Sequence, residues 1–300
     1  MLKRLADLAK EKTVKIVGHK NPDFDSIVSG ILLGIFLRAN NINAEFVCDG
    51  VSDSNTLSAL EYVGINVNDF CKGIKSDDFV FFVDHHSSEY EFDNFIVGCV
   101  DHHQTNSAVD IPIYFNAPSS SCAMNIFHIA QKEGFAFERN ELKLIVMSIY
   151  MDTRSCKSTK FIESDREFII ETAKEYSFEG ELDIFERFGY CLTDMTKPIE
   201  KLAETDMKEY FFAGNKIIIS HLQVMRNPSV DGVLKEICAY ATSECQKSGI
   251  GIWIIMVSDP NTETTEVIRI DGKSVENKRY TKLLSRSTDV IPALEKEFNL

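Results

Sequence analysis

Short apolar runs alternate with segments of helical period through the first half of the chain. The apolar runs predict strands, and the last two are apolar enough to be buried on both faces. These runs are residues 13–17, 44–47, 79–83 and 95–100. Apolar residues at helical spacing predict helices at residues 26–37, 55–63, 122–132, 141–150 and 164–176. The alternation predicts an α/β fold, with a parallel sheet and helices on both of its faces.

The pattern changes near residues 181–200, where we expect a second domain to begin. Residues 189–198 are expected to be a linker into a helix, with Thr196 as its N-cap and Pro198 in its first turn. Beyond the linker the pattern predicts two strands joined by a Gly-Asn turn, a long helix, a hairpin and a short terminal helix. These elements are residues 209–212, 216–221, 231–247, 251–257, 264–270 and 292–298. We therefore predict a domain of residues 1–190 and a smaller α+β domain of residues 191–300.

Composition and charge narrow the class of protein. A chain of 300 residues has room for two domains with separate cores. The formal net charge of −14 disfavours general nucleic-acid binding, which depends on Lys and Arg at phosphates. Bound cations can still invert the electrostatic field in one cleft and admit a small anionic substrate.

No apolar run reaches about 18 residues, so no membrane span is predicted. The N-terminus lacks a signal-type apolar segment, which predicts a cytoplasmic protein.

Acidic and imidazole side chains lie where the buried elements end. The set of four aspartates and two histidines is His19, Asp23, Asp25, Asp84, His102 and Asp152. In parallel sheets, ligands gather at the carboxyl ends of the strands. Carboxylate oxygens with some imidazole suit a pair of divalent cations such as Mn²⁺ or Mg²⁺. We therefore predict a site for two metal ions.

The spacing of the carboxylates favours phosphoryl hydrolysis. Asp23 and Asp25 are two positions apart on a loop that Pro22 stiffens, so each can reach a different ion, and Asp84 can bridge both. Two ions roughly 3.5–4 Å apart lower the pKa of a shared water, which makes a bridging hydroxide available near neutral pH. A plainer interpretation of the same loop is helix capping by Ser26, with the carboxylates near the helix N-terminus.

The histidine pairs need separate interpretation. We expect His102 to be a metal ligand, and His103 to contact the substrate or give a proton to the leaving oxygen. Asp101 is expected to orient a histidine. The roles of His85 and His86 stay open between support of the site and plain surface.

Four motifs resemble those of the DHH phosphoesterase superfamily. In order, they are residues 18–26, Asp84, Asp101-His102-His103 and Asp152-Thr153. The second half is similar to the domain called DHHA2, through the segments 206–210 and 285–292. The resemblance covers nearly the whole chain and points to family II, manganese-dependent inorganic pyrophosphatases and related exopolyphosphatases.

This resemblance implies a role for each site residue. One ion would be bound by His19, Asp23 and Asp84, and the other by Asp25, Asp84, His102 and Asp152. The residues implied as catalytic are Asp23, Asp84 and His103, and those implied to bind substrate phosphates are His103, Lys208 and Arg286. The resemblance also implies two Mn²⁺ ions per chain, with Co²⁺ or Mg²⁺ as alternatives. It further implies a homodimer and a hinge at residues 189–198 that closes the second domain onto the first.

A few residues depart from the family pattern. Ser287 and Thr288 stand where the family has two lysines, and Asp289 replaces a glutamine. His86 stands where the pyrophosphatases have Asn. Losing a cation and gaining a carboxylate would weaken the grip on a small diphosphate, so the metal site is predicted more firmly than its substrate.

The expected function is hydrolysis of phosphoanhydride bonds, with inorganic pyrophosphate as the first substrate. Short-chain exopolyphosphatase activity is one alternative. Phosphodiester hydrolysis of short oligonucleotides or cyclic dinucleotides is another, although the Gly-Gly-Gly-His motif of such relatives is absent from this sequence. A third alternative is a protein that binds a phosphate ligand without turnover.

Overall fold

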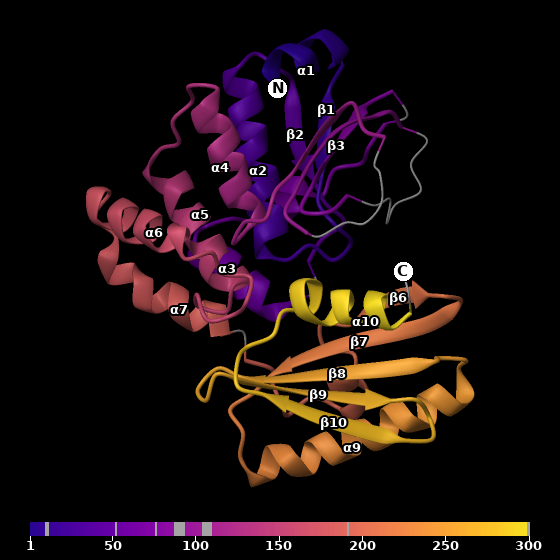
Figure 1. Cartoon of the computed structure of the whole chain (residues 1–300). Helices are drawn as coiled ribbons and strands as arrows, with labels where there is room; N and C mark the ends of the chain where they lie inside the picture. Colours follow the sequence, from indigo (N-terminus) through magenta and orange to yellow (C-terminus); the bar gives the residue numbers. More distant parts are fainter. Residues whose placement is uncertain are drawn as a thin grey trace. The chain divides into compact units, whose positions relative to one another are not determined.

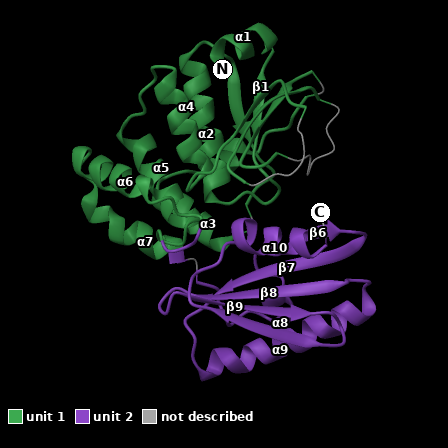
Figure 2. Cartoon of the chain, in the orientation of Figure 1, with its two compact units in different colours: residues 1–156, 160–189 green, residues 157–159, 190–300 purple. Residues whose placement is uncertain are grey.

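The chain divides into two compact units, which Figure 2 colours separately. Unit 1 comprises Met1–Cys156 and Lys160–Gly189, and unit 2 comprises Lys157–Thr159 and Tyr190–Leu300. The computed structural model describes residues 1–9, 12–51, 53–75, 77–86, 94–103, 110–190 and 192–298. The assignment of residues 1–190 and 191–300 to DHH and DHHA2 domains stays a prediction.

Unit 1 is built on a parallel sheet (Figure 1). Its strands are β1 (Val14–Val17), β2 (Ala44–Val47), β3 (Phe79–Val83), β4 (Ile96–Asp101) and β5 (Ile113–Asn116). Their order is β2-β1-β3-β4-β5, and every neighbouring pair is parallel. The strand order reverses between β1 and β3, and ligands of open α/β sheets bind at the carboxyl ends of the strands at such a point. The loops after β1 and β3 carry His19 and Asp84.

Helices flank the sheet of unit 1. They are α1 (Leu2–Ala9), α2 (Phe24–Ala39), α3 (Ser54–Tyr62), α4 (Cys122–Lys132), α5 (Arg139–Asp152), α6 (Ser164–Glu175) and α7 (Leu182–Tyr190), with 3₁₀ turns η1 (Val67–Phe70) and η2 (Glu179–Glu181). Helix α2 is buried along most of its length, which explains why it is apolar on nearly all sides. The larger core joins the helices to strand residues such as Phe81 and Val83, and a smaller cluster includes Val80 and Phe82.

Unit 2 is built on a mixed sheet of five strands. They are β6 (Lys208–Phe212), β7 (Asn215–Gln223), β8 (Ile252–Asp259), β9 (Thr264–Ile270) and β10 (Val275–Tyr280). The order is β10-β9-β8-β7-β6. Strands β7 and β8 pair in parallel, and the other pairs are antiparallel, including the predicted hairpin β8–β9. This smaller α+β unit agrees with the predicted fold class.

Two clusters form the core of unit 2. Helices α8 (Ile199–Ala203) and α9 (Pro228–Lys247) contribute to one cluster, and η3 (Arg286–Val290) and α10 (Ile291–Glu297) contribute to the other. The helix after the linker begins at Ile199 with Pro198 at the N-cap position, so the prediction that Thr196 caps it is wrong. Thr196 instead binds Asp194 through its own N–H and hydroxyl. Over the described ranges, no helix is long and apolar enough to cross a membrane.

Candidate metal centre

The loop between β1 and α2 supplies the first residues of the site. The buried His19 has its Nδ1 2.9 Å from the Lys20 carbonyl oxygen, and its Nε2 lies 3.6 Å from Asp23 Oδ2. Asp23 is the N-cap of α2, because its Oδ1 accepts a hydrogen bond of 3.0 Å from the Ser26 N–H. The alternative in which Ser26 caps this helix is therefore wrong. A carboxylate caps a helix as well as a hydroxyl does, and Ser26 lies in the first turn.

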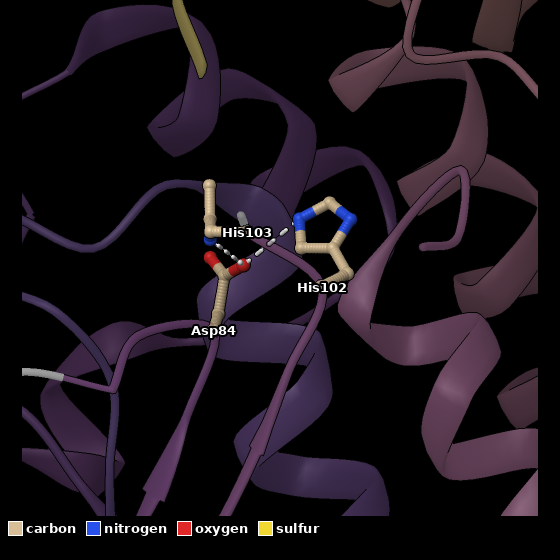
Figure 3. Close-up of side chains that lie close together, drawn as sticks. All are labelled: Asp84, His102 and His103. Atoms are coloured by element: carbon tan, nitrogen blue, oxygen red, sulfur yellow. Dashed lines mark ion pairs between the residues drawn. The ribbon is translucent and has the colours of Figure 1, made fainter. Parts of the chain in front are cut away.

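Asp84 follows β3 and lies between two histidines from different loops. Its φ of 63° is in the left-handed region, which Asp tolerates better than most residues. Its N–H donates to the Val100 carbonyl at 3.0 Å. Its Oδ2 lies 3.5 Å from His19 Nε2. Its Oδ1 lies 3.3 Å from His102 Nε2 and 3.7 Å from His103 Nδ1 (Figure 3). One buried carboxylate therefore faces ligands on both sides.

His102 follows β4 and is fixed by its backbone and its ring. Its N–H donates to Asp101 Oδ1 at 2.7 Å, and its Nδ1 lies 2.9 Å from the Ser119 carbonyl oxygen. An imidazole that donates from Nδ1 to a carbonyl presents Nε2 as a ligand atom. That Nε2 lies 3.5 Å from Asp152 Oδ2 and 3.8 Å from Asp25 Oδ2.

Asp25 and Asp152 come to the site from two helices. Asp25, in the first turn of α2, accepts hydrogen bonds from the N–H groups of Cys122 at 2.6 Å and Ala123 at 3.1 Å, where α4 begins. The Ser148 hydroxyl of α5 donates to it at 2.9 Å. Asp152 is the last residue of α5. Helix α2, which packs on the sheet, and α5, which packs on α2, thus position these carboxylates.

The structure brings the six predicted ligands into two adjoining groups. The groups are His19, Asp23 and Asp84, and Asp25, His102 and Asp152, and within each the ligand atoms lie within 4.8 Å of one another. A third group, Asp84, His102 and His103, overlaps both. The first group is a set that the resemblance implies, and the second is the other implied set without Asp84. The role of each residue as a ligand stays a prediction.

Among the described residues, two buried polar atoms at the centre of these groups have no hydrogen-bond partner. They are Asp84 Oδ1 and His102 Nε2, which face each other at 3.3 Å without the alignment of a hydrogen bond. Leaving such an atom unpaired costs about 1–3 kcal/mol. A divalent cation would bind both an oxygen and an imidazole nitrogen. The donor set therefore fits a metal ion, and these two atoms are the observation that supports the fit.

The charges of the site point the same way. Burial, with Asp84 and Asp152 nearby, raises the pKa of Asp25 to about 7. Burial and Lys160 would lower the pKa of His102, but Asp84 and Asp152 raise it to about 9. The carboxylates of the site therefore outnumber its positive charges, and Asp25 and His102 retain protons where metal ions would otherwise bind. Metal binding to such a site displaces those protons.

Asp101 supports two histidines through one buried carboxylate. His103 Nδ1 lies 2.8 Å from Asp101 Oδ1, and His86 Nδ1 lies 2.6 Å from Asp101 Oδ2. Burial would raise the pKa of Asp101, but the two imidazoles hold it below its usual value. His86 thus has a supporting contact. His85 is buried, with its Nδ1 3.0 Å from the Val83 carbonyl oxygen, so it is not a plain surface residue.

Lys160 is a residue of this site that sequence reasoning missed. Its Nζ lies 2.7 Å and 2.5 Å from the two carboxylate oxygens of Asp152, and its side chain is 11% exposed. Burial would lower the pKa of Lys160, but Asp152, Asp84 and Asp23 raise it. A single lysine eight positions after an aspartate gives no pattern by which it could be recognised in the sequence.

Lys208 and Arg286, the other predicted phosphate-binding residues, belong to unit 2. Lys208 opens β6 and is half-buried. Arg286 donates to the backbone carbonyl of Asp206 and, at 2.9 Å, to Asp206 Oδ1. The side chain of Arg286 is therefore held in place by the segment that precedes β6. A role in substrate binding stays a prediction for both residues.

Asp289, one of the departures from the family pattern, makes contacts within unit 2. It accepts hydrogen bonds from the Ser285 N–H at 2.8 Å and from the Thr159 hydroxyl, and Lys282 Nζ lies 3.0 Å from its Oδ1. Burial would raise the pKa of Asp289, but these partners lower it. The carboxylate thus stabilises the turn that carries Arg286.

Comparisons with known proteins agree with this geometry. Residues 13–149 match the DHH family, N-terminal domain. A manganese-dependent inorganic pyrophosphatase of Methanocaldococcus jannaschii is 25% identical, over 95% of this chain and 99% of the relative. A protein of Clostridium acetobutylicum, named a probable manganese-dependent inorganic pyrophosphatase, is 24% identical, over 95% and 97%.

Solved structures show the same fold. A Methanococcus jannaschii protein described as a family II inorganic pyrophosphatase superposes with a TM-score of 0.78 at 20% identity, covering 96% of this chain and all of its own. An exopolyphosphatase-related protein of Bacteroides fragilis gives a TM-score of 0.52 at 14% identity, covering 99% and 96%. Residues 13–149 thus match the DHH family, and the chain is an enzyme that resembles manganese-dependent inorganic pyrophosphatases along nearly its whole length.

Proposed function

We propose that this protein is a manganese-dependent hydrolase of phosphoanhydride bonds, with inorganic pyrophosphate as its main substrate. The observation that carries the proposal is the position of Asp84, which faces His19 on one side and His102 on the other. A carboxylate in this position can bind two cations at once. Two adjoining cation sites of oxygen and imidazole ligands are the arrangement that favours phosphoryl hydrolysis.

The six ligands divide between two ions in the proposal. His19, Asp23 and Asp84 would bind one ion, and Asp25, His102 and Asp152, with Asp84 shared, would bind the other. When bound, the two ions would supply an activated water and neutralise the charge of the phosphoryl group. The relatives named manganese-dependent support Mn²⁺, and the number of ions is our proposal.

The other residues of the chain orient the substrate and handle protons. The carboxylate of Asp101 holds the ring of His103 through Nδ1, so its Nε2 is the atom that can contact a phosphate or donate a proton to the leaving oxygen. His103 is 25% exposed at its side chain, and a ligand from solvent can therefore reach it. Lys208 and Arg286 are proposed to bind phosphate oxygens.

The proposal is tested by the release of phosphate from two phosphoanhydrides and of mononucleotides from a dinucleotide. Purified protein is incubated with pyrophosphate, tripolyphosphate or a dinucleotide, each in Mn²⁺, Co²⁺ or Mg²⁺. We expect the fastest release from pyrophosphate in Mn²⁺. Release from neither phosphoanhydride would refute the proposal. Cleavage of the dinucleotide alone would establish the phosphodiesterase alternative, and binding of pyrophosphate without product would establish the alternative of a binding protein.

Short polyphosphate is the second candidate substrate, and the residues at 287 and 288 favour it. The two expected lysines are replaced by Ser287 and Thr288, and the Ser287 hydroxyl lies 3.1 Å from that of Ser285. Because this turn carries fewer cations than the family pattern, it would attract a compact diphosphate less strongly. We expect Ser287→Lys to lower the KM for pyrophosphate relative to that for tripolyphosphate. An unchanged ratio would show that position 287 does not contact substrate.

Two assignments from the resemblance complete the proposal. Residues 1–190 would be the DHH domain that binds the metals, and residues 191–300 would be the DHHA2 domain that contributes Lys208 and Arg286. The chain would form a homodimer. Light scattering of the purified protein measures its mass, and a mass of one chain at working concentration would contradict the dimer.

A further inference from the structure

Lys160 lies in the loop after α5, next to a carboxylate that the metal centre needs. Its Nζ is within 2.7 Å of both oxygens of Asp152, and Asp152 Oδ2 is also 3.5 Å from His102 Nε2. The Lys160 side chain is 11% exposed and that of Asp152 is 15% exposed. A lysine ammonium is strongly hydrated in water, so one that is held so deeply needs an anionic partner.

With a divalent cation bound, Asp152 would have a second partner besides Lys160. The carboxylate would then neutralise the cation, and a doubly charged ion beside the ammonium repels it. A lysine ammonium has three N–H donors and no acceptor. The two oxygens of one carboxylate can accept hydrogen bonds from only two of these donors. The remaining donor of Lys160 needs an anion that arrives together with the metal. A phosphate oxygen is the anion that the proposed reaction brings.

The charge balance of the chain supports the same conclusion. Ser287 and Thr288 supply no cation where the family pattern has two. Lys160 adds a cation that is only slightly exposed to the unit that carries the metal ligands. A substrate with several negative charges would therefore find a positive partner within unit 1 itself.

We propose that Lys160 is a substrate-binding residue, whose ammonium binds an anionic phosphoryl oxygen of a phosphoanhydride once cations occupy Asp152 and its neighbours. The proposal deepens the proposed function and rests on it. It assigns to Lys160 a part in recognition that neither the motifs nor the metal ligands supply. In the absence of metal the same ammonium pairs with Asp152.

The test measures ligand binding and metal binding separately. Manganese-loaded protein is titrated with methylenediphosphonate, an analogue that cannot be hydrolysed at its bridge, by calorimetry. The variants are Lys160→Met, which removes the charge, Lys160→Gln, which keeps a donor to Asp152, and Lys160→Arg, which keeps the charge. The matched control is Lys143→Met, because Lys143 is also partly buried and pairs with Glu181 at 2.6 Å.

We expect Lys160→Met and Lys160→Gln to weaken binding of the diphosphonate by roughly 10- to 100-fold, as for the loss of one charge-assisted hydrogen bond. Lys160→Arg should recover most of this loss, and Lys143→Met should bind as the wild type does. Titration with Mn²⁺ alone should show the same number of ions in all variants. Binding of Mn²⁺ should be equal or tighter without the lysine, because a neighbouring positive charge is gone.

Three results would overturn the proposal. Diphosphonate binding that is unchanged in both neutral variants would show that Lys160 does not contact the ligand. Loss of bound Mn²⁺ in those variants would show that Lys160 only positions Asp152. Failure of Lys160→Arg to recover binding would exclude a role of the charge.

The same titrations separate this inference from the proposed function. If wild-type protein binds Mn²⁺ but no diphosphonate, the proposed function fails and the inference fails with it. If the wild type binds diphosphonate and the neutral variants bind it equally, only the inference about Lys160 fails. A melting curve of each variant with Mn²⁺ shows that the compared proteins are folded.

Discussion

At the scale of single residues, several side chains of the metal centre are fixed by a second contact. His102 is fixed through the Ser119 carbonyl, His103 through Asp101, and Asp25 through N–H groups at the start of α4. Such outer contacts orient ligands and are worth about 10- to 100-fold in metal affinity or activity. The site is therefore held in position by the fold before any ligand binds.

Asp84 is the residue on which the two groups of ligands depend. We expect Asp84→Asn to lower Mn²⁺ affinity by roughly 100-fold or more, which exceeds the effect of losing a residue that only supports a ligand. We also expect it to abolish phosphate release. Metal analysis after gel filtration and a phosphate assay measure both effects. Asp7→Asn, on the exposed side of α1, is the matched control. A variant at Asp84 that retained two ions and normal rates would show that this residue does not bridge them.

His128 predicts how the stability of unit 1 depends on pH. Burial lowers the pKa of this half-buried imidazole, with Asp165 opposing the shift. The unfolded chain, with a pKa of about 6.5, then binds the proton more readily than the folded chain does. The contribution of His128 to stability is therefore present above the unfolded pKa, and it is lost as the pH falls below that value.

The prediction for His128 is checked with His128→Gln in the presence of a chelator. Thermal unfolding of both proteins is followed between pH 5 and pH 8. We expect the wild type to lose more stability than the variant as the pH falls. Parallel curves for the two proteins would mean that His128 titrates alike in the folded and unfolded chains.

At the scale of elements, α2 combines a packing role with a functional one. Its N-cap is Asp23 and its first turn carries Asp25. Farther along, Gly30 lets the helix approach β2 closely, because a Cβ at this position would lie 2.1 Å from the ring of Phe46. The position of the carboxylates therefore depends on how the helix packs against the sheet.

Gly30→Ala tests this close packing. We expect it to destabilise unit 1 by about 1–3 kcal/mol, because the buried Phe46 ring must shift. Gly232 in α9 offers a matched control, since a Cβ there meets no atom within 4 Å. Gly232→Ala should stabilise unit 2 by about 0.5–1 kcal/mol, the usual gain in a helix interior. Denaturant unfolding measures both, and a neutral Gly30→Ala would show that the sheet and helix separate easily.

The sequence predicted those elements whose apolar residues repeat with a regular period. Strands β1 to β4 and helices α2, α4 and α5 have such patterns, and the structure confirms them. Strand β10 (Val275–Tyr280) was not predicted because it is an exposed edge strand with mostly polar residues. Strand β5 was missed because it has four residues, of which only Ile113 is buried.

The same limit applies to the site. Residues that follow buried strands, such as His19 and Asp84, could be predicted because strand ends meet at one edge of a parallel sheet. Lys160 and the contact between His86 and Asp101 depend on loops that no periodic pattern describes. Only the folded chain shows these contacts.

At the scale of the whole molecule, the two units have separate cores and different relations to metal. The two adjoining groups of ligands both lie in unit 1. Binding to the folded state stabilises it by about 2.7 kcal/mol at a ligand concentration of 100 times Kd. We therefore expect Mn²⁺ to raise the melting temperature of unit 1 and to leave that of unit 2 nearly unchanged.

Calorimetry with and without Mn²⁺ checks this expectation, and we expect one transition for each of the two cores. Asp84→Asn serves as the control and should remove the shift. The Gly232→Ala variant assigns one transition to unit 2 by moving it. Equal shifts of both transitions in Mn²⁺, or none, would contradict the assignment of the metal ligands to unit 1.

The most direct test of the account is the anomalous scattering of a crystal soaked in manganese. The account predicts two strong peaks roughly 3.5–4 Å apart. One would lie against His19, Asp23 and Asp84, and the other against Asp25, His102 and Asp152, with Asp84 between them. A map without density at these side chains, or with manganese bound elsewhere, would contradict the central claim.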